Sequence, residues 1–259
     1  MNRYARRLVA GALVLALGAF GIAGAAAEPL RLAIGYIPHV QFAPLYVGIE
    51  KGFYKAEGID LTIEYGFGID VFSLLSAGRI DLGLSDSDQL IVAGAKGLGL
   101  RAVFQYYQRY PVSIVALSRK AATPEALRGK VIGTPELYGT SYIGMLLFLR
   151  HHGLDKAVKI EKIGYTQITS LDRGTVDAVV CFSNNEPVQL RHSGYDVAEW
   201  KVRELSDMFG ASFISSDKIV TAKADLLARF ARATRKAMEY TVANQEEAFR
   251  LSKPYLGPV

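Results

Sequence analysis

Short apolar runs alternate with longer stretches of helical periodicity along most of the chain. RLAIGY (31–36) and DLGLSD (81–86) have the length of buried strands, whereas APLYVGIEKGFYKAEG (43–58) repeats its apolar positions at helical spacing and ends at a glycine. This alternation of strand and helix predicts an α/β architecture built on parallel sheets.

The same order of predicted elements begins a second time after residue 130. SAGRIDLGLSD (76–86) and LDRGTVDAVVCFSNNE (171–186) both read as a helix end, a glycine, any residue, an apolar residue, an aspartate and then alternating apolar positions. Ile34 and Ile132, in the first strand of each unit, lie nearly the same distance before that aspartate. We therefore expect two similar α/β units in one chain.

Two such units predict two lobes that face each other across a cleft. The predicted boundaries give a first lobe over residues 28–115, a second lobe over 116–205 and a return to the first lobe over 206–259. The return contains a helical pattern with one apolar face, which we expect to pack on the first lobe. The sequence stops at PYLGPV without a clear final element, which is typical of a truncated chain.

The first 27 residues have the pattern of a secretory signal peptide. Three arginines stand within the first seven residues, residues 8–24 are almost wholly apolar, and AAA (25–27) supplies a cleavage site of small residues. A membrane anchor is the alternative, but the apolar run is short and ends in small residues. No cysteine follows the run, so lipid attachment is not expected. The sequence thus predicts an exported, periplasmic protein that begins near Glu28.

Removal of the signal peptide leaves a nearly balanced charge. The chain has 30 Lys and Arg against 25 Asp and Glu, and three of the arginines lie in the signal peptide. The basic character of the whole sequence therefore gives little support to a nucleic-acid partner. Cys181 is the only cysteine, which excludes an intramolecular disulfide and a cysteine metal cluster.

Ligands of open parallel sheets bind beyond the carboxyl ends of the strands, in the loops that lead into helices. Four loops meet this condition, two from each unit: 36–44, 85–89, 134–142 and 182–187. We expect these loops to form the walls of the cleft.

The first loop, YIPHVQFAP, is restricted by its two prolines. Tyr36 and Phe42 either offer flat apolar faces to a ring or pack in the core. His39 has neither a nucleophile nor a second histidine at ligand spacing, so a hydrogen-bonding or surface role is favoured over catalysis.

The second and third loops lead into predicted helices. Ser85 and Asp86 are N-cap candidates, and their position at the sheet edge also suits hydrogen bonding to a ligand. Gly139, Thr140 and Ser141 open a helix whose free N–H groups can receive a polar or anionic group. Capping without a ligand is the alternative for both loops.

The fourth loop, FSNNEP, places Asn185 and Glu186 where a strand leaves the sheet. Glu186 can accept a hydrogen bond from a heterocycle and the asparagine can donate and accept, whereas a solvated turn is the alternative. Arg109, near the expected crossing between lobes, either holds an anion or braces the hinge, and the sequence does not rank the two.

Signatures of enzymes are missing from the sequence. It contains no G-x-S-x-G, no H-E-x-x-H and no phosphate-binding Walker loop. GAKGLG (94–99) follows a helical pattern rather than a strand, so it does not read as a dinucleotide loop. His151 and His152 are adjacent, a spacing that suits metal ligation poorly. We expect neither a catalytic site nor a metal site.

Four long stretches resemble one known family. They are GYIPHVQFAPLYVGIEKGFYKAEGIDL, LLSAGRIDLGLSDSDQLIVAGAKG, TPEALRGKVIGTPELYGTSY and GTVDAVVCFSNNEPVQLRHSGYDV, and together they span nearly all of residues 30–250. In this order they are similar to ABC-transporter substrate-binding proteins of the thiamine-precursor, riboflavin and sulfonate group. The resemblance implies a type II periplasmic-binding-protein fold, in which two parallel-sheet lobes joined by a hinge close on a small molecule in a central cleft. It also implies a membrane permease as partner, a monomeric protein, no nucleic acid and no cofactor.

Within that group, YIPHVQFAP, YQRYP and NNEPVQL are most similar to members that bind flat nitrogen heterocycles, namely thiamine pyrimidine precursors or riboflavin. Binding of an alkanesulfonate, taurine or nitrate-type anion is the alternative. The family also includes a yeast-type enzyme that makes the thiamine pyrimidine from its own histidine and pyridoxal phosphate. That enzyme carries a cysteine-rich motif, whereas this chain has one cysteine and an export signal, so we expect a binding protein. The expected ligand site consists of Tyr36, His39, Gln41, Phe42, Ser85, Asp86, Arg109, Tyr138, Gly139, Thr140, Ser141, Asn185 and Glu186.

Overall fold

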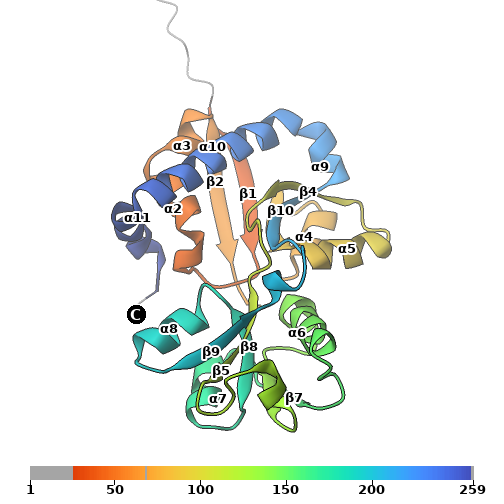
Figure 1. The fold of residues 1–259 in the computed structure, drawn as a ribbon. Coiled ribbons are helices and arrows are strands. Elements are labelled where there is room, and N and C mark those ends of the chain that lie inside the picture. The colour runs from red at the N-terminus through yellow and green to blue at the C-terminus, as the bar shows by residue number, and fades with distance from the viewer. Residues whose placement is uncertain (1–25, 68, 258–259) are drawn as a thin grey trace, which may run out of the picture.

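The computed structural model describes residues 26–67 and 69–257, which form two α/β lobes (Figure 1). Residues 1–25 of the predicted signal peptide lie outside the described residues. Each lobe is built on one five-stranded sheet with helices packed against it.

The first sheet has the strand order β2-β1-β3-β10-β4. β1 pairs in parallel with β2 and β3, whereas β10 runs antiparallel to both β3 and β4. The strands are β1 (Glu28–Ile34), β2 (Ile59–Tyr65), β3 (Leu82–Asp86), β4 (Leu100–Gln105) and β10 (Ala211–Ser216).

The second sheet has the equivalent order β7-β6-β8-β5-β9. β6 pairs in parallel with β7 and β8, whereas β5 runs antiparallel to both β8 and β9. The strands are β5 (Val112–Leu117), β6 (Val131–Thr134), β7 (Lys159–Lys162), β8 (Ala178–Phe182) and β9 (Val197–Lys201).

Helices occupy most of the connections between strands. The α-helices are α2 (Ala43–Glu50), α3 (Phe53–Ala56), α4 (Val71–Ser76), α5 (Ser87–Ala95), α6 (Gly139–His151), α7 (Gln167–Asp172), α8 (Glu186–His192), α9 (Asp217–Ala222), α10 (Ala224–Ala243) and α11 (Gln245–Ser252). Short 3-10 turns are η1 (Val40–Phe42), η2 (Pro124–Leu127), η3 (Val202–Glu204) and η4 (Lys253–Tyr255). In the described part of the chain, no helix combines the length and apolar character needed to cross a membrane.

The α/β fold class is confirmed, but the expectation of purely parallel sheets is wrong by one strand in each sheet. The exceptions are β5 and β10, the first strands that the chain enters after each crossing between lobes. The crossings join the two sheets at their facing carboxyl edges. A strand that starts at such an edge must run away from it, so it is antiparallel to strands that end there.

The crossings themselves lie at 106–111 and 202–210, between β4 and β5 and between β9 and β10. The predicted boundary between residues 115 and 116 falls inside β5, and all of β5 pairs within the second sheet. The predicted boundary between residues 205 and 206 falls within the second crossing.

The two crossings are hydrogen-bonded to each other. The backbone N–H groups of Tyr106 and Tyr107 donate to the carbonyl oxygen of Ala211, at 3.0 and 2.9 Å, and the N–H of Gly210 donates back to Tyr107. A Cβ atom on Gly210 would lie 2.4 Å from the Cβ of Tyr107 and 3.0 Å from the carbonyl oxygen of Arg109. Glycine at this position therefore permits the close approach of the two connections.

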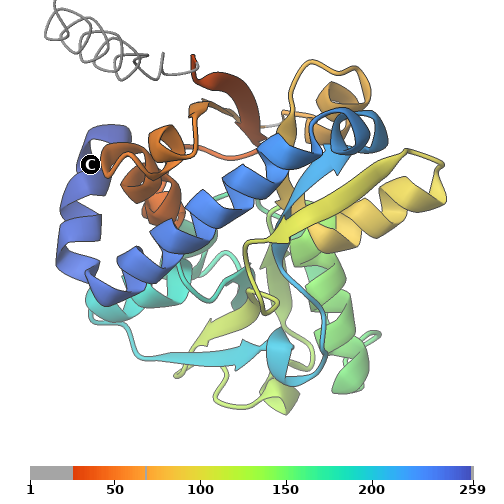
Figure 2. The same cartoon turned by 90° about the horizontal axis from the view of Figure 1, so that it is seen from above.

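The C-terminal helices return to the first lobe. Figure 2 shows α10 running across that lobe with α11 beyond it, and the buried residues of α10 include Leu227, Phe230 and Thr234. The ring of Tyr54 stacks on Phe230 at a centroid distance of 5.6 Å, and its hydroxyl lies 3.0 Å from the Thr234 hydroxyl. The expected packing of an apolar helical face on the first lobe is what the structure shows.

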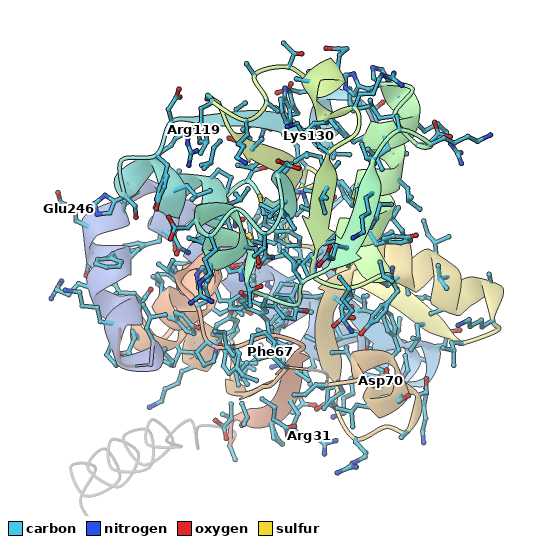
Figure 3. The ribbon with its side chains drawn as sticks, turned by 90° about the horizontal axis from the view of Figure 1, so that it is seen from below. Arg31, Phe67, Asp70, Arg119, Lys130 and Glu246 are labelled. Atoms are coloured by element: carbon cyan, nitrogen blue, oxygen red, sulfur yellow. The ribbon has the colours of Figure 1, made fainter. Side chains whose placement is uncertain are left out.

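The repeated aspartates occupy equivalent places in the two lobes. Asp81 donates its N–H to the carbonyl oxygen of Arg31 and accepts the Arg31 N–H on its carboxylate, both at 2.9 Å. Asp177 makes the same pair of contacts with Val131, at 2.9 and 3.1 Å. Each aspartate thus joins the turn before β3 or β8 to the neighbouring parallel strand, β1 or β6. Figure 3 shows Arg31 and Lys130, the residue before Val131, at opposite ends of the molecule.

Strand register corrects one detail of the predicted repeat. Leu32 pairs with Leu82 in the first sheet, and Ile132 pairs with Ala178 in the second. The counterpart of Ile132 is therefore Leu32, two residues before the predicted Ile34. A shift of two residues keeps a side chain on the same face of a strand, so the apolar pattern did not reveal it.

We expect Asp81→Ala to lower the free energy of unfolding by about 2–3 kcal/mol, because charged hydrogen bonds to Arg31 and Lys223 are lost. Asp177→Ala should cost less, since the Asp177 side chain is 20% exposed and that of Asp81 4%. Urea denaturation measures both, with the exposed Asp60→Ala as a control expected to change stability by less than about 0.5 kcal/mol. Equal losses for Asp60→Ala and Asp81→Ala would contradict this account.

Candidate functional site

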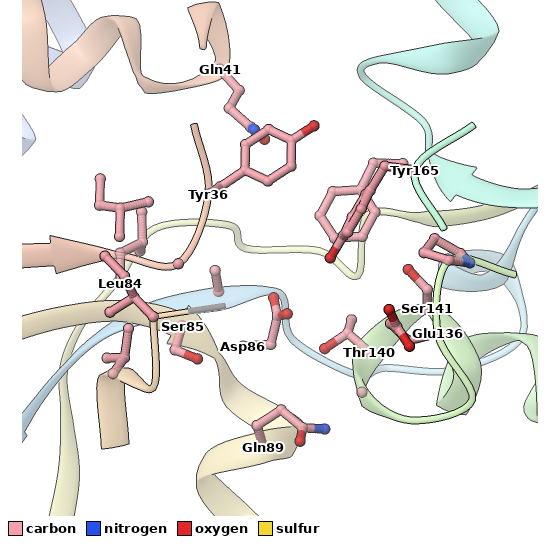
Figure 4. A pocket seen from close by; sticks show the side chains of 18 of the residues that line it. Tyr36, Gln41, Leu84, Ser85, Asp86, Gln89, Glu136, Thr140, Ser141 and Tyr165 are labelled. Carbon is pink, nitrogen blue, oxygen red and sulfur yellow. The ribbon is translucent and has the colours of Figure 1, made fainter. Parts of the chain in front are cut away.

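A cavity of about 340 Å³ lies where the carboxyl edges of the two sheets face each other. All four loops selected from the sequence contribute to it. Figure 4 shows Tyr36, Gln41, Ser85 and Asp86 of the first lobe opposite Thr140, Ser141 and Tyr165 of the second. Its volume lies in the range of small-molecule sites.

Most of the residues expected at the ligand site line this cavity. They are Tyr36, Gln41, Phe42, Ser85, Asp86, Tyr138, Gly139, Thr140, Ser141, Asn185 and Glu186. His39 and Arg109 are not among the lining residues.

His39 stabilises the first loop from outside the cavity lining. It is the N-cap of η1, where its Nδ1 accepts a hydrogen bond from the N–H of Gln41 at 3.3 Å. Its own N–H donates to the hydroxyl of Tyr46 at 3.2 Å, and its ring lies edge-on to Tyr36. Burial lowers the pKa of His39, which keeps Nδ1 available as an acceptor. The structure therefore gives His39 a local structural role.

Arg109 is exposed in the first crossing, away from the cavity lining. Arg109 contributes to the contact between the two crossings through its backbone, because its carbonyl oxygen lies against Gly210 of the second crossing. Of the two roles left open by the sequence, this position fits a brace of the hinge.

Aromatic rings meet across the cleft. Tyr36 packs edge-on against Phe67 of its own lobe at a centroid distance of 5.2 Å, and lies 6.3 Å from Tyr165 of the other lobe. Phe67 and Tyr165 are 5.0 Å apart and remain 52% and 57% exposed. Phe42, by contrast, is almost fully buried against core rings. We call Tyr36, Phe67 and Tyr165 the aromatic bridge.

Carboxylates line the cavity on both sides. Burial raises the pKa of Asp86 to about 6, and the nearby charge of Asp88 acts in the same direction. Burial also raises the pKa of Glu186, one of whose oxygens accepts the N–H of Phe182 at 3.2 Å. Among the described residues that line the cavity there is no Lys, Arg or His. The cavity is therefore suited to hydrogen-bond donors and to uncharged or cationic groups.

Two hydrogen-bond chains connect the lobes beside the cavity. Asp88 of α5 accepts the hydroxyl of Thr140 of α6 at 2.8 Å, and the hydroxyl of Tyr110 donates to the Thr140 carbonyl at 2.7 Å. The Thr140 hydroxyl, expected at the ligand, is thus committed to the contact between lobes.

The second chain passes through the first crossing. The hydroxyl of Tyr107 donates to Gln41 Oε1 at 2.8 Å and accepts from Asn184 Nδ2 at 3.4 Å. Gln41 therefore serves the same kind of contact as Thr140, although it also lines the cavity.

Sequence reasoning missed Tyr165 and Gln167, which line the second-lobe side. Gln167 is only 5% exposed. Tyr165 lies in the connection from β7 to α7, and Gln167 is the first residue of α7. The strand-end rule that selected the other loops applies to this edge strand too, and would have found them.

The loop after β2 was missed in the same way. It brings Asp70 to the cavity wall and Phe67 to the aromatic bridge. Glu136 also lines the cavity, and its carboxylate pairs with Lys162 at 2.5 Å.

A family model described as "NMT1/THI5 like" matches residues 39–248 of the chain. The chain belongs to the NMT1/THI5-like family. This membership confirms the resemblance seen in the sequence, and the family contains proteins of more than one function.

This NMT1/THI5-like chain is 31% identical over 234 residues to the riboflavin-binding protein RibY of Chloroflexus aurantiacus, covering 88% of the chain and 67% of that protein. It is 28% identical over 235 residues to a formylaminopyrimidine-binding protein of Halalkalibacterium halodurans, covering 87% and 70%. A 4-amino-5-hydroxymethyl-2-methylpyrimidine phosphate synthase of Legionella pneumophila is 26% identical over 237 residues, covering 88% and 74%. Similar proteins thus include binders and an enzyme.

The fold of this family member is that of periplasmic binding proteins. The periplasmic aliphatic sulphonate binding protein SsuA of Escherichia coli superposes with a TM-score of 0.73 at 16% identity, covering 88% of the chain and 78% of SsuA. At this identity the similarity concerns the fold and not the ligand.

The raised pKa of Asp86 predicts a pH-dependent difference between the protein and its Asp86→Asn variant. Between pH 3.8, the ordinary pKa, and about 6, the folded protein holds a proton on Asp86 that the unfolded chain releases. The contribution of Asp86 to the free energy of unfolding therefore falls as pH rises through that window. The Tm of Asp86→Asn should improve relative to the parent protein over the same window and stay level above it.

A series of thermal melts from pH 4 to pH 7 without ligand measures this difference, with Asp60→Asn on the exposed face of β2 as the matched control. A constant difference in Tm across the series would show that Asp86 is not buried as described.

Proposed function

We propose that the protein is the periplasmic solute-binding component of an ABC importer and captures a flat nitrogen heterocycle, either riboflavin or a thiamine pyrimidine precursor. One observation supports this most directly: the cavity between the lobes combines accessible aromatic faces with carboxylates, amides and hydroxyls and no cationic lining group among the described residues. The N–H edge of a heterocycle matches such acceptors, and its faces match the rings.

Riboflavin is the first candidate because the match to a riboflavin-binding protein reaches 31% identity. In the proposed complex, Tyr36 and Tyr165 contact the faces of the ring system. Asp86 and Glu186 accept hydrogen bonds from its ring N–H and side-chain hydroxyl groups, and Gln167 supplies an amide that can both donate and accept.

An anion such as a sulfonate is the less favoured ligand. A sulfonate would face Asp86 and Glu186, and the lining offers no Lys or Arg among the described residues to compensate. Several helices start at lining residues, and among them α6 and α7 hold no acidic residue in their first turn. A helix dipole contributes only about 0.3–1 kcal/mol at accessible sites.

A pyrimidine-synthesising enzyme is also less favoured. The yeast-type enzyme named in the sequence analysis uses its own histidine, yet no histidine lines the cavity among the described residues. His39 uses its Nδ1 to cap η1, and His151, His152 and His192 lie at the distal ends of α6 and α8.

The affinity must come largely from closure of the lobes. A Kd of 1 μM corresponds to about −8 kcal/mol. Two aromatic contacts supply about 0.5–1.5 kcal/mol each beyond area burial, so most of the binding energy must come from desolvation of the ligand between lobes. The hydrogen bonds from Thr140 to Asp88 and from Tyr107 to Gln41 favour this closed arrangement of the lobes.

Thermal-shift measurements on the mature protein with riboflavin, aminopyrimidines, taurine and alkanesulfonates test the proposal. We expect stabilisation by riboflavin or by an aminopyrimidine, because only a heterocycle matches both the rings and the acceptors. Stabilisation by a sulfonate alone would overturn the proposal. If the protein converts a bound pyrimidine and His39→Ala abolishes this turnover, the protein is an enzyme and the proposed binding function is wrong.

Tyr165→Ala should weaken binding of the heterocycle by about 10-fold, because it removes one wall of the aromatic contact. Phe249→Ala is the matched control: Phe249 is 51% exposed on α11 and does not line the cavity. Quenching of flavin fluorescence, or calorimetry for a pyrimidine, gives both dissociation constants. Equal affinity of the two variants would place the ring elsewhere.

A further inference from the structure

We propose that the cavity selects the free alcohol form of its ligand and rejects the phosphate ester of the same molecule. The inference rests on the proposed function, since it concerns the same heterocycle site. It concerns a choice that riboflavin and the thiamine pyrimidine both present, because each has a hydroxymethyl group that is phosphorylated in its ester.

The first observation is the sign of the charge around the cavity. Asp70, Asp86, Glu136 and Glu186 line it, and no Lys, Arg or His does so within 26–67 and 69–257. Asp70 accepts the N–H and the hydroxyl of Ser73, and Glu186 accepts the N–H of Phe182. Of the four, only Glu136 is paired with a cation, Lys162. Asp86 and Glu186, one from each lobe, are the buried carboxylates without a cationic partner in the described structure.

The second observation concerns the helix N-termini at the cavity, where a phosphate could find donors. Of the helices that start at lining residues, α4, α5 and α8 carry Asp70, Asp86 and Glu186 at that end, whereas α6 and the short α7 carry no acidic residue there. The N-terminus of α6 opens on the cavity and has no side-chain cap, which by itself favours an anion. Asp86 lies beside Thr140 on the facing wall (Figure 4). The Thr140 hydroxyl is donated to Asp88 and is not available to a phosphate oxygen. A dianion at this helix end would therefore meet a second anion at close range.

The third observation is the set of neutral groups that remain. Ser85, Gln89, Ser141 and Gln167 line the cavity. Gln167 is 95% buried and lines the cavity. Hydroxyl and amide groups suit a sugar-alcohol or hydroxymethyl group well, whereas they leave the charge of a phosphate uncompensated.

The size of the discrimination follows from charge and dielectric. A phosphate monoester carries about −1.5 to −2 charges at neutral pH. Repulsion from a carboxylate across a partly desolvated site, with an effective dielectric near 20, corresponds to a discrimination on the order of 100-fold in Kd.

This selectivity also places the protein in a reaction sequence. A phosphorylated source of the ligand must first undergo hydrolysis of the phosphate monoester, in which water attacks phosphorus and the ester P–O bond breaks. The products are the free alcohol, which the cavity accepts, and inorganic phosphate. Any phosphorylation of the ligand must then take place after its uptake.

The test compares two pairs of probes on the mature protein: riboflavin with its 5′-phosphate, and 4-amino-5-hydroxymethyl-2-methylpyrimidine with its phosphate. The Kd of the phosphate should exceed that of the alcohol by about 100-fold in the pair that binds. In Asp86→Asn and in Glu186→Gln this ratio should fall by about 10-fold, even where both dissociation constants rise. Because only the ratio reports the charge, loss of a shared hydrogen bond does not mimic the effect.

Ser141→Ala and Gln167→Ala are the matched controls, since each removes a neutral lining group. They should weaken both members of a pair and leave the ratio unchanged. Thermal melts of every variant confirm folding before the ratios are compared.

The outcomes separate the two proposals. Equal affinity for alcohol and phosphate, or a ratio that survives both carboxylate substitutions, overturns the selectivity and keeps the heterocycle site. Binding of none of the four probes overturns the proposed function and the selectivity together.

Discussion

The whole molecule depends on one constraint: the chain passes twice between two sheets whose carboxyl edges face each other. That geometry forces the first strand after each passage to run against its neighbours, as β5 and β10 do. It also brings the loops of both lobes to a single cavity, because in parallel sheets those loops emerge at the carboxyl edge. The hydrogen bonds between Tyr106, Tyr107 and Ala211 hold the two passages side by side, and Gly210 leaves room for them.

The polar groups around the cavity divide into two sets with different tasks. One set joins the lobes: Thr140 is bound by Asp88, and Gln41 by Tyr107. The other set, which includes Ser85, Asp86 and Gln167, lines the cavity itself. The lobe contacts determine how the cavity is shaped when closed, and the lining groups determine which molecule fits it.

The sequence was sufficient for the fold class, the internal repeat and most of the cavity wall, because each rests on local pattern. Glycine, aspartate and apolar spacing located Asp81 and Asp177, and strand ends located loops of both lobes. It was not sufficient for strand direction, since β5 is equally apolar whichever way it runs. It also missed Gln167, which follows a short exposed strand of weak pattern, and it could not show that His39 caps its own loop.

The aromatic bridge gives the cleft a property that neither lobe has alone. Tyr36 and Phe67 contact Tyr165 across the gap, so each ring covers part of the apolar surface of its neighbours, although Phe67 and Tyr165 remain about half exposed. A ligand that binds between these rings must break their contacts and replace them with contacts of its own. A planar ligand can bury the separated ring faces again on both of its own faces. A small round or fully hydrated ligand leaves the ring faces exposed to water. The contacts among these three rings thereby compete with ligand binding, and a ligand that is not flat enough to replace them gains little from association.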